Sequence, residues 1–266
     1  GNMKIEAGKM RKLQINLFFV AKLLPFLLVF LWVETGLAIP VEEIRKMQAE
    51  LQGKPTGERI VFFAERFVGT PYDKDPQGEY VTRAAIVADE RVDCMYLTFR
   101  AVELALSHTP EDAIQIALDK RFHSRGVLRD GKVANYEDRF EYGEDMIQSG
   151  KWGREITSEL GRNIKIAGSR GKEYWEILPS KEFLKGVGNL RSGDILFFMT
   201  PPGRRKVGEA VGHIGIVKVE GEPVSKKFYL IHAGGTKTKG GMVKKVPLKG
   251  YLAKMPFMGV KITRFE

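Results

Sequence analysis

The sequence predicts an α+β fold in which helices come first and an antiparallel sheet follows. In the first half of the chain, apolar residues recur every three to four positions, as in amphipathic helices. From residue 193 onward, short β-rich runs are separated by Gly, Pro and Lys. Helical and strand patterns do not alternate, which argues against a parallel sheet. With 266 residues, 43% of them apolar, the chain can bury one sizeable core but not two full domains.

The first 38 residues have the pattern of a secretory signal peptide. Basic residues precede an apolar stretch at 23–33, and residues 36–38 then form a small-x-small pattern. This stretch, interrupted by Pro25, is shorter than the roughly 20 apolar residues of a membrane span. We therefore expect export to the periplasm or the extracellular space, cleavage near Ala38, and no stable membrane span in the mature chain. A buried core helix or a membrane anchor is the alternative.

The net charge of the chain is +10. Residues 1–38 carry five basic and two acidic side chains, which leaves about +7 for the rest. This charge favours an anionic partner: nucleic acid, a membrane surface or an acidic wall polymer. Nucleic acid does not fit the expected export, and no nucleic-acid-binding motif is present, so we expect no nucleic-acid partner.

Helical and strand signals follow in order along the chain. Helices are expected at 41–51, 58–67, 94–106, 110–120 and 135–148, with a weaker signal at 182–184. Strands are expected at 193–199, 213–219, 227–232 and 258–265, and a short strand at 80–87. We expect an initial helix and linker at 39–58, followed by the main domain at 59–266.

Cys94 is the only cysteine of the chain, so it cannot form an intramolecular disulfide. In an exported protein a free thiol is exposed to oxidation unless it is buried or used, and a buried cysteine that packs as a small apolar residue is the alternative. Asp93 reads as the cap of helix 94–106, which places Cys94 in the first turn. Free N–H groups and the helix dipole favour a thiolate there.

A thiol nucleophile needs a base, and the chain offers four histidines. His108 and His123 lie in settings typical of surface histidines. His213 opens one β-run and His232 closes another, so two neighbouring antiparallel strands could bring a base and its orienting partner together. Hydrogen-bonded residues at strand ends are the alternative for both.

Five motifs in order resemble the NlpC-type cell-wall cysteine amidases and endopeptidases. The motifs are Gly69 to Tyr72, Asp93-Cys94, Gly193-Asp194-Ile195, Gly212 to Ile216 and Ile231-His232-Ala233. The resemblance implies a papain-like core, in which the helix bearing the nucleophile packs on a small antiparallel sheet.

The resemblance also implies roles for individual residues. Cys94 would be the nucleophile, His213 the general base and acid, and His232 the polar residue that orients His213. Tyr72 matches a tyrosine that helps to bind the oxyanion, where a hydroxyl donor gains strength in the transition state. A turn tyrosine packed on the core is its alternative. No metal and no other cofactor is implied.

Two departures from the family pattern concern the substrate. Met95-Tyr96 replaces the usual small residues after the cysteine, and an insertion at about 107–190, expected to be mainly helical, separates Cys94 from His213. The insertion is similar to that of the secreted N-acetylmuramoyl-L-alanine amidase-like branch. This branch implies hydrolysis of the amide between muramic acid, including its anhydro form, and L-Ala in peptidoglycan or muropeptides.

The same insertion supplies two candidate substrate contacts, Tyr136 and Arg139. Arg139 could bind a substrate carboxylate with two hydrogen bonds, or instead pair with Glu137 or Glu141 on its own segment.

Three other functions remain open from the sequence. An endopeptidase that cuts between D-Glu and the diamino acid would need an acid for the L-Ala amine, and Asp73, Asp75 or Glu79 could serve. A zinc amidase would reach the same bond, but no HExxH or other tight ligand spacing is present. A non-catalytic wall-binding module would use the basic surface and leave Cys94 inert.

Overall fold

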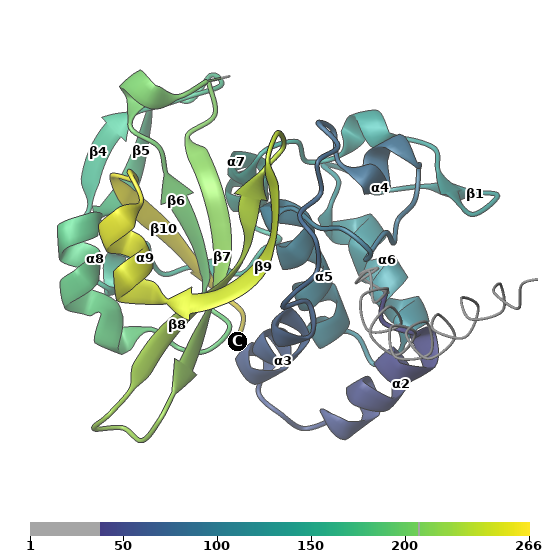
Figure 1. The fold of residues 1–266 in the computed structure, drawn as a ribbon. Helices are drawn as coiled ribbons and strands as arrows, with labels where there is room; N and C mark the ends of the chain where they lie inside the picture. The colour runs from purple at the N-terminus through teal and green to yellow at the C-terminus, as the bar shows by residue number, and fades with distance from the viewer. Residues whose placement is uncertain (1–37, 207) are drawn as a thin grey trace, which may run out of the picture. The chain divides into compact units, whose positions relative to one another are not determined.

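An antiparallel sheet of eight strands organises the part of the chain that the computed structural model describes, residues 38–206 and 208–266 (Figure 1). The strand order is β4-β5-β10-β6-β7-β8-β9, and β3 also pairs with β10. The strands are β3 (Arg154–Glu155), β4 (Ile164–Ala167), β5 (Tyr174–Pro179), β6 (Ile195–Met199), β7 (Val211–Glu220), β8 (Lys227–Thr236), β9 (Gly240–Pro247) and β10 (Gly259–Arg264). A separate hairpin consists of β1 (Leu128–Arg129) and β2 (Lys132–Val133).

Helices cover both faces of this sheet. They are α2 (Val41–Glu50), α3 (Thr56–Arg66), α4 (Glu79–Thr82), α5 (Cys94–Leu106), α6 (Pro110–Lys120), α7 (Gly143–Ser149), α8 (Ser180–Gly186) and α9 (Leu248–Lys254). Short 3₁₀ turns lie at Tyr136–Asp138, Thr157–Glu159, Val187–Asn189 and Pro202–Arg204. Figure 1 shows α3 and α5 on one side of the sheet and α8 and α9 on the other. The expected α+β class is therefore confirmed at the level of a mixed fold with an antiparallel sheet.

Strand β6 is buried on both faces, which explains why its sequence is apolar throughout. Ile195, Phe197 and Met199 belong to the core shared with α3 and α5, whereas Leu196 and Phe198 belong to the core beneath α8 and α9. All five side chains are fully buried. A strand covered on both faces has no solvent side, so it loses the alternation of polar and apolar residues that a half-buried strand shows.

The helix that carries the cysteine begins at the expected residue. Asp93 caps α5, because its carboxylate accepts a hydrogen bond of 2.8 Å from the backbone N–H of Tyr96. Thr109 caps α6 in the same way, at 3.1 Å from the N–H of Asp112. The helices expected at 41–51 and 58–67 are also present, as α2 and α3.

The initial helix α2 packs directly on α5. The side-chain amide of Gln48 is fully buried and donates to the hydroxyl of Ser107 at 2.6 Å and to the carbonyl oxygen of Leu104 at 3.3 Å. Helix α2 therefore belongs to the same structural unit as the cysteine helix.

Two expected elements are wrong. Residues 80–87 do not form a strand. Asp73 accepts a 2.6 Å hydrogen bond from the N–H of Glu79, where the short helix α4 begins. The helix expected at 135–148 is broken into a 3₁₀ turn and α7, because Phe140 donates its N–H to the carbonyl oxygen of Arg121 at 2.8 Å. This long-range bond holds the chain extended after the 3₁₀ turn.

The insertion at 107–190 is not mainly helical, and the sheet is larger than expected. Strands β4 and β5 lie within the insertion and extend the sheet beyond β10. Strand β4 lies at one end of the strand order and β9 at the other, and each has one buried side chain, Ile166 and Val243 respectively. Edge strands expose most of their side chains and carry lysines, so their sequences lack the apolar pattern of a central strand.

The Gly193-Asp194-Ile195 motif has a structural role. The carboxylate of Asp194 is fully buried and accepts two hydrogen bonds from the guanidinium of Arg264, at 2.6 and 2.7 Å. Gly193 has a φ of +89°, and a Cβ there would lie 2.4 Å from the Cα of Gly57. The motif thus joins the start of β6 to the end of β10 and to the segment that begins α3.

The expected signal peptide lies outside the described residues, apart from Ala38. From residue 38 onward, leaving aside residue 207, none of the helices is long and apolar enough to cross a membrane.

Candidate active site

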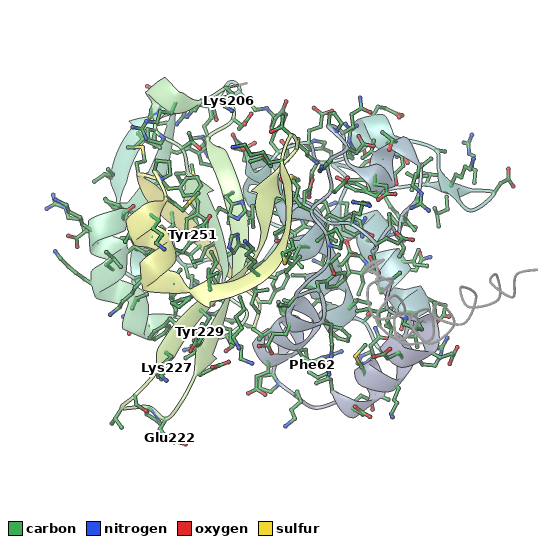
Figure 2. All side chains as sticks on the ribbon, in the orientation of Figure 1. Phe62, Lys206, Glu222, Lys227, Tyr229 and Tyr251 are labelled. Atoms are coloured by element: carbon green, nitrogen blue, oxygen red, sulfur yellow. The ribbon has the colours of Figure 1, made fainter. Side chains whose placement is uncertain are left out.

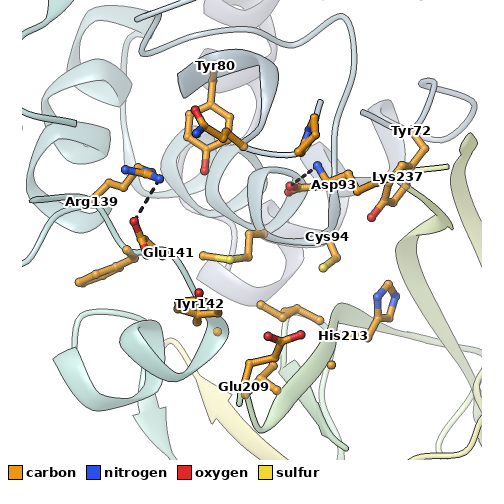
Figure 3. A pocket seen from close by; sticks show the side chains of 18 residues that line it. Tyr72, Tyr80, Asp93, Cys94, Arg139, Glu141, Tyr142, Glu209, His213 and Lys237 are labelled. Carbon is orange, nitrogen blue, oxygen red and sulfur yellow. Dashed lines mark hydrogen bonds and ion pairs between the residues drawn. The ribbon is translucent and has the colours of Figure 1, made fainter. Parts of the chain in front are cut away.

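Cys94 lies in the wall of a cavity of about 440 Å³ (Figure 3). The cavity is bordered by the start of α5, the segment around Tyr72, the segment 139–143, the start of β7 and the turn between β8 and β9. His213 and Arg139 line it as well. Figure 3 shows the side chains of Cys94 and His213 side by side at one end of this cavity. The fold therefore brings the sole thiol and one expected histidine together from positions far apart in the sequence.

Burial dominates the acidity of the thiol. Burial, and after it the charge of the Asp93 carboxylate, raise the pKa of Cys94 to about 12. The backbone N–H groups of Ile214 and Cys94 and the ammonium of Lys237 act in the opposite direction. The helix start alone was expected to favour a thiolate, but desolvation outweighs it, so the thiol is protonated at neutral pH.

The two histidines contact each other, although they do not lie at strand ends as expected: His213 is the third residue of β7, and His232 lies in the interior of β8. Nε2 of His213 lies 2.8 Å from Nδ1 of His232, and the rings are nearly perpendicular, at 86°. Burial, and after it the neighbouring His232, lower the pKa of His213 to about 3. The pKa of His232 falls to about 4, again mainly through burial and then through the charge of Lys244. Both rings are neutral at neutral pH, so one donates and the other accepts the hydrogen bond.

Aromatic side chains enclose this pair. The ring of Phe257 is parallel to that of His213 within 9°, at a centroid distance of 6.5 Å, and the ring of Phe198 lies at 6.2 Å. Tyr251 of α9, labelled in Figure 2, lies 4.8 Å from His232 and 6.1 Å from His213. These rings exclude water and account for the lowered pKa values. Sequence reasoning missed them, because Tyr251 and Phe257 lie outside all the motifs.

Tyr72 is held at the cavity by the hairpin of β8 and β9. Its N–H donates to the carbonyl oxygen of Gly241 at 2.8 Å. Its ring lies against Gly235, where a Cβ would come within 2.6 Å of the ring. Burial and the negative charge of a Cys94 thiolate raise the pKa of Tyr72, so the hydroxyl keeps its proton and can donate a hydrogen bond.

The two expected substrate contacts differ in position. Arg139 lines the cavity, and its guanidinium lies 3.2 Å from the carboxylate of Glu141 and donates to the carbonyl oxygen of Tyr136 at 2.9 Å. Tyr136 does not line the cavity. Its hydroxyl lies within hydrogen-bonding distance of the carbonyl oxygens of Tyr80 and Ala85, at 2.8 and 2.6 Å.

Glu209 and Lys237 also line the cavity, and neither had a prior signal in the sequence. Lys237 lies in the turn after β8, and its ammonium is 3.4 Å from the carboxylate of Asp93. A lone lysine in a polar turn has no motif around it, so only its position relative to α5 shows that it belongs to the site.

The departure at Met95-Tyr96 has a structural explanation. Met95 forms part of the cavity wall, whereas Tyr96 points into the core. The hydroxyl of Tyr96 donates to Asp89 at 2.9 Å and accepts from the N–H of Ala88 at 2.5 Å. Asp89 also accepts two hydrogen bonds from the guanidinium of Arg100, at 2.7 and 2.9 Å. Because Tyr96 and Arg100 both belong to α5, Asp89 anchors this helix to the segment before it.

The three acids that an endopeptidase could use to bind the L-Ala amine instead bind neighbouring residues of their own loop. Asp73 accepts hydrogen bonds from the N–H groups of Asp75 and Glu79, at 2.9 and 2.6 Å. Asp75 accepts from the hydroxyl of Thr82, and Glu79 pairs with Arg83 at 3.2 Å. None of the three carboxylates lines the cavity.

His108 and His123 do not line the cavity either. The ring of His123 packs edge-on against Phe140, at 4.9 Å. Among the residues that the structure describes, no three His, Cys, Asp or Glu side chains are grouped so that they could hold a metal ion.

No model of a known protein family matches the chain, and no curated protein does. Several solved structures are similar to it, among them the following three. An N-acetylmuramoyl-L-alanine amidase from Bacteroides uniformis has a TM-score of 0.57 and 19% identity, over 79% of this chain and 98% of that chain. A Legionella pneumophila protein with the family designation DUF1460 has a TM-score of 0.61 and 14% identity, over 84% and 93%. A Bacteroides fragilis protein provisionally named a xylanase has a TM-score of 0.56 and 19% identity, over 77% and 99%.

At these identities the likeness shows a shared fold. The names of the similar structures differ, so the activity has to be argued from the residues of the site.

Proposed function

We propose that the protein is a cysteine amidase that hydrolyses the amide between N-acetylmuramic acid, including its anhydro form, and L-Ala in peptidoglycan fragments. The observation that carries the proposal is the cavity that joins Cys94 to His213, with His232 hydrogen-bonded behind it. A helix bearing the cysteine, packed on an antiparallel sheet bearing both histidines, agrees with a papain-like core. The similar structure named as an amidase supports the choice of bond.

The hydrogen bond between the histidines determines the path of the proton. Nε2 of His213 is engaged with His232, which leaves Nδ1 of His213 for the thiol. Because both groups are neutral at rest, the proton moves from Sγ of Cys94 to Nδ1 as sulfur attacks the carbonyl carbon of the muramic lactyl group.

The remaining steps reuse the same imidazole. His213 gives its proton to the amide nitrogen, the C–N bond breaks, and the peptide leaves with L-Ala at its amino terminus. A water molecule then loses a proton to His213 and attacks the thioester, which releases the muramic carboxylic acid and restores the thiol. His232 accepts from Nε2–H throughout and stabilises the imidazolium when it forms.

Two sets of donors are available for the oxyanion. The hydroxyl of Tyr72 keeps its proton, and the first turn of α5 carries backbone N–H groups without partners within the helix. Arg139 is in position to bind a carboxylate of the peptide, and Tyr136 holds the guanidinium in place through its carbonyl oxygen. We therefore propose a direct substrate contact for Arg139 and an indirect one for Tyr136.

The endopeptidase is less well supported than the amidase. It requires a free carboxylate for the L-Ala amine, and Asp73, Asp75 and Glu79 are engaged in the loop instead. A non-catalytic wall-binding module does not require a tyrosine, a thiol and an imidazole around one cavity, so this arrangement favours an enzyme.

Mass spectrometry of the products from muramoyl and anhydromuramoyl peptides tests the proposal. The expected products are the free muramic sugar and an intact L-Ala-D-Glu-diamino-acid peptide. Release of an L-Ala-D-Glu dipeptide would reject the amidase in favour of the endopeptidase. Cys94→Ala should be inactive and folded, since a methyl group occupies most of the space of the thiol. Wild-type turnover by this variant would reject the thiol mechanism, and inactivation by EDTA that zinc reverses would indicate a metalloamidase.

We also propose that the protein is exported and that residues 1–38 are removed. Amino-terminal sequencing of the protein from its native host tests this, and a mature chain that retains residues 1–38 would contradict it.

A further inference from the structure

Lys237 places a positive charge in the wall of the cavity, close to the nucleophile. It lies in the turn between β8 and β9 and lines the cavity together with Cys94. Its ammonium is 3.4 Å from the Asp93 carboxylate and 5.8 Å from the centre of the Tyr72 ring. About a third of the side chain, 34%, is exposed. An ammonium has three donor hydrogens, and the described residues supply one long contact, so a ligand can accept from the others.

Two of the other charged groups that line the cavity, Asp93 and Arg139, are paired with neighbouring residues, whereas Oε2 of Glu209 has no hydrogen-bond partner among the described residues. Asp93 accepts from the N–H of Tyr96 through one oxygen and faces Lys237 with the other. Arg139 lies on a different wall and is paired with Glu141. Glu209 also lines the cavity, and burial raises its pKa. Lys237 is therefore the cation best placed to act on a charged group bound beside Cys94.

We infer that Lys237 determines specificity by charge: it binds a carboxylate of the substrate beside the scissile amide and disfavours an ammonium there. The inference rests on the proposed function for the identity of the substrate. In a muramoyl-L-Ala-D-Glu fragment, the α-carboxylate of D-Glu is the anion nearest to the amide. An endopeptidase substrate carries the same carboxylate still closer to its scissile carbonyl, so Lys237 selects the charge of the substrate and not the bond that is cut.

A first experiment probes the charge at Cys94 without any substrate. Iodoacetate and iodoacetamide both alkylate a thiolate with loss of iodide, and they differ mainly in charge. We compare the ratio of their rates at Cys94 with the ratio for free cysteine. Lys237→Met should lower the ratio about fivefold. Lys237→Arg should keep it. Lys239→Met, an exposed lysine on the same turn, should leave it unchanged.

A second experiment uses two substrates that differ in one group, muramoyl-L-Ala-D-Glu and muramoyl-L-Ala-D-isoglutamine. The wild-type protein should prefer the acid over the amide by about tenfold in kcat/KM, since a hydrogen bond to a charged group contributes about 1.4 kcal/mol or more. Lys237→Met should abolish this preference by lowering kcat/KM for the acid, whereas Lys237→Arg, which keeps the positive charge, should retain the preference. Circular dichroism spectra of the variants confirm that they are folded.

The two experiments separate the inference from the proposed function. If the wild-type protein hydrolyses neither substrate, the proposed function fails, and the alkylation ratio still tests Lys237. An alkylation ratio in Lys237→Met equal to that of the wild-type protein overturns the inference, and so does an undiminished preference for the acid in that variant.

Discussion

Nε2 of His213 lies 2.8 Å from Nδ1 of His232, across the neighbouring strands β7 and β8. His232 is buried and His213 is half-buried against aromatic side chains, and both pKa values are lowered, so the pair forms one neutral hydrogen-bonded unit. His213 is the member that lines the cavity with Cys94. In the proposed mechanism, His213 therefore transfers the proton and His232 orients its ring.

Replacing the two histidines should therefore have unequal effects. His213→Ala should reduce kcat/KM by at least about a thousandfold because it removes the base, whereas His232→Ala should cost about ten- to a hundredfold because an unsupported ring still accepts a proton. Steady-state kinetics on a muramoyl peptide measure both. A more severe loss in His232→Ala would show that the two roles are exchanged.

The pH dependence of activity should show a wide plateau. In the proposed mechanism His213 acts as the base in its unprotonated form, and its pKa of about 3 means that protonation begins only well below the ordinary histidine range. The pKa of Cys94 is about 12, so its side chain remains a thiol at the pH values at which activity is measured. We expect kcat/KM to be nearly constant between about pH 5 and 9. An acidic limb centred between pH 6 and 7 would contradict the neutral buried pair.

The free energy of unfolding should also depend on the protonation of the two histidines. A histidine with a lowered pKa in the folded state binds fewer protons there than in the unfolded state, which titrates near 6.5. The free energy of unfolding should consequently fall as the pH decreases from about 6.5 toward 4. Denaturant unfolding at several pH values measures this slope. The slope should be smaller in the double variant His213→Asn, His232→Asn, and an unchanged slope would assign it to other groups.

Gly235→Ala should act on catalysis through Tyr72. A Cβ at this position would lie 2.6 Å from the tyrosine ring and 2.6 Å from the carbonyl oxygen of Gly240, so the ring and the facing strand of the hairpin must both shift. We expect kcat to fall to about the level of Tyr72→Phe, on the order of ten- to a hundredfold, as when an oxyanion donor is lost. Gly188→Ala has no atom within 4 Å of its Cβ and serves as a control. Normal kcat in Gly235→Ala, together with a fully active Tyr72→Phe, would remove Tyr72 from the oxyanion site.

Asp194→Asn should lower the stability of the fold and leave catalysis unchanged. The variant leaves the guanidinium of Arg264 with a neutral partner in a site where Asp194 is fully buried. Breaking a buried ion pair on one side costs about 3–5 kcal/mol. Chemical denaturation should show this loss, while kcat per folded molecule stays unchanged. A selective loss of kcat at full stability would place Asp194 in the active site instead.

Local signals in the sequence were sufficient for the elements that depend on neighbours along the chain. Asp93 caps α5 and Thr109 caps α6, because a capping bond spans only three residues. The ordered motifs placed the two histidines on strands, and the structure brings them together, although within the strands and not at their ends. Only tertiary contacts decided the extended segment after Tyr136–Asp138, since a backbone bond to Arg121 holds it.

The chemistry of the site was decided at the tertiary level. The sequence pattern at Cys94 favours a thiolate, yet burial raises the pKa of the thiol to about 12. Tyr251 and Phe257, which follow every motif in the chain, enclose the histidines, and Lys237 reaches Asp93 from a turn on the sheet. Capping and periodicity are local and can be read along the chain. Desolvation and the pairing of charges depend on segments that become neighbours only when the chain folds.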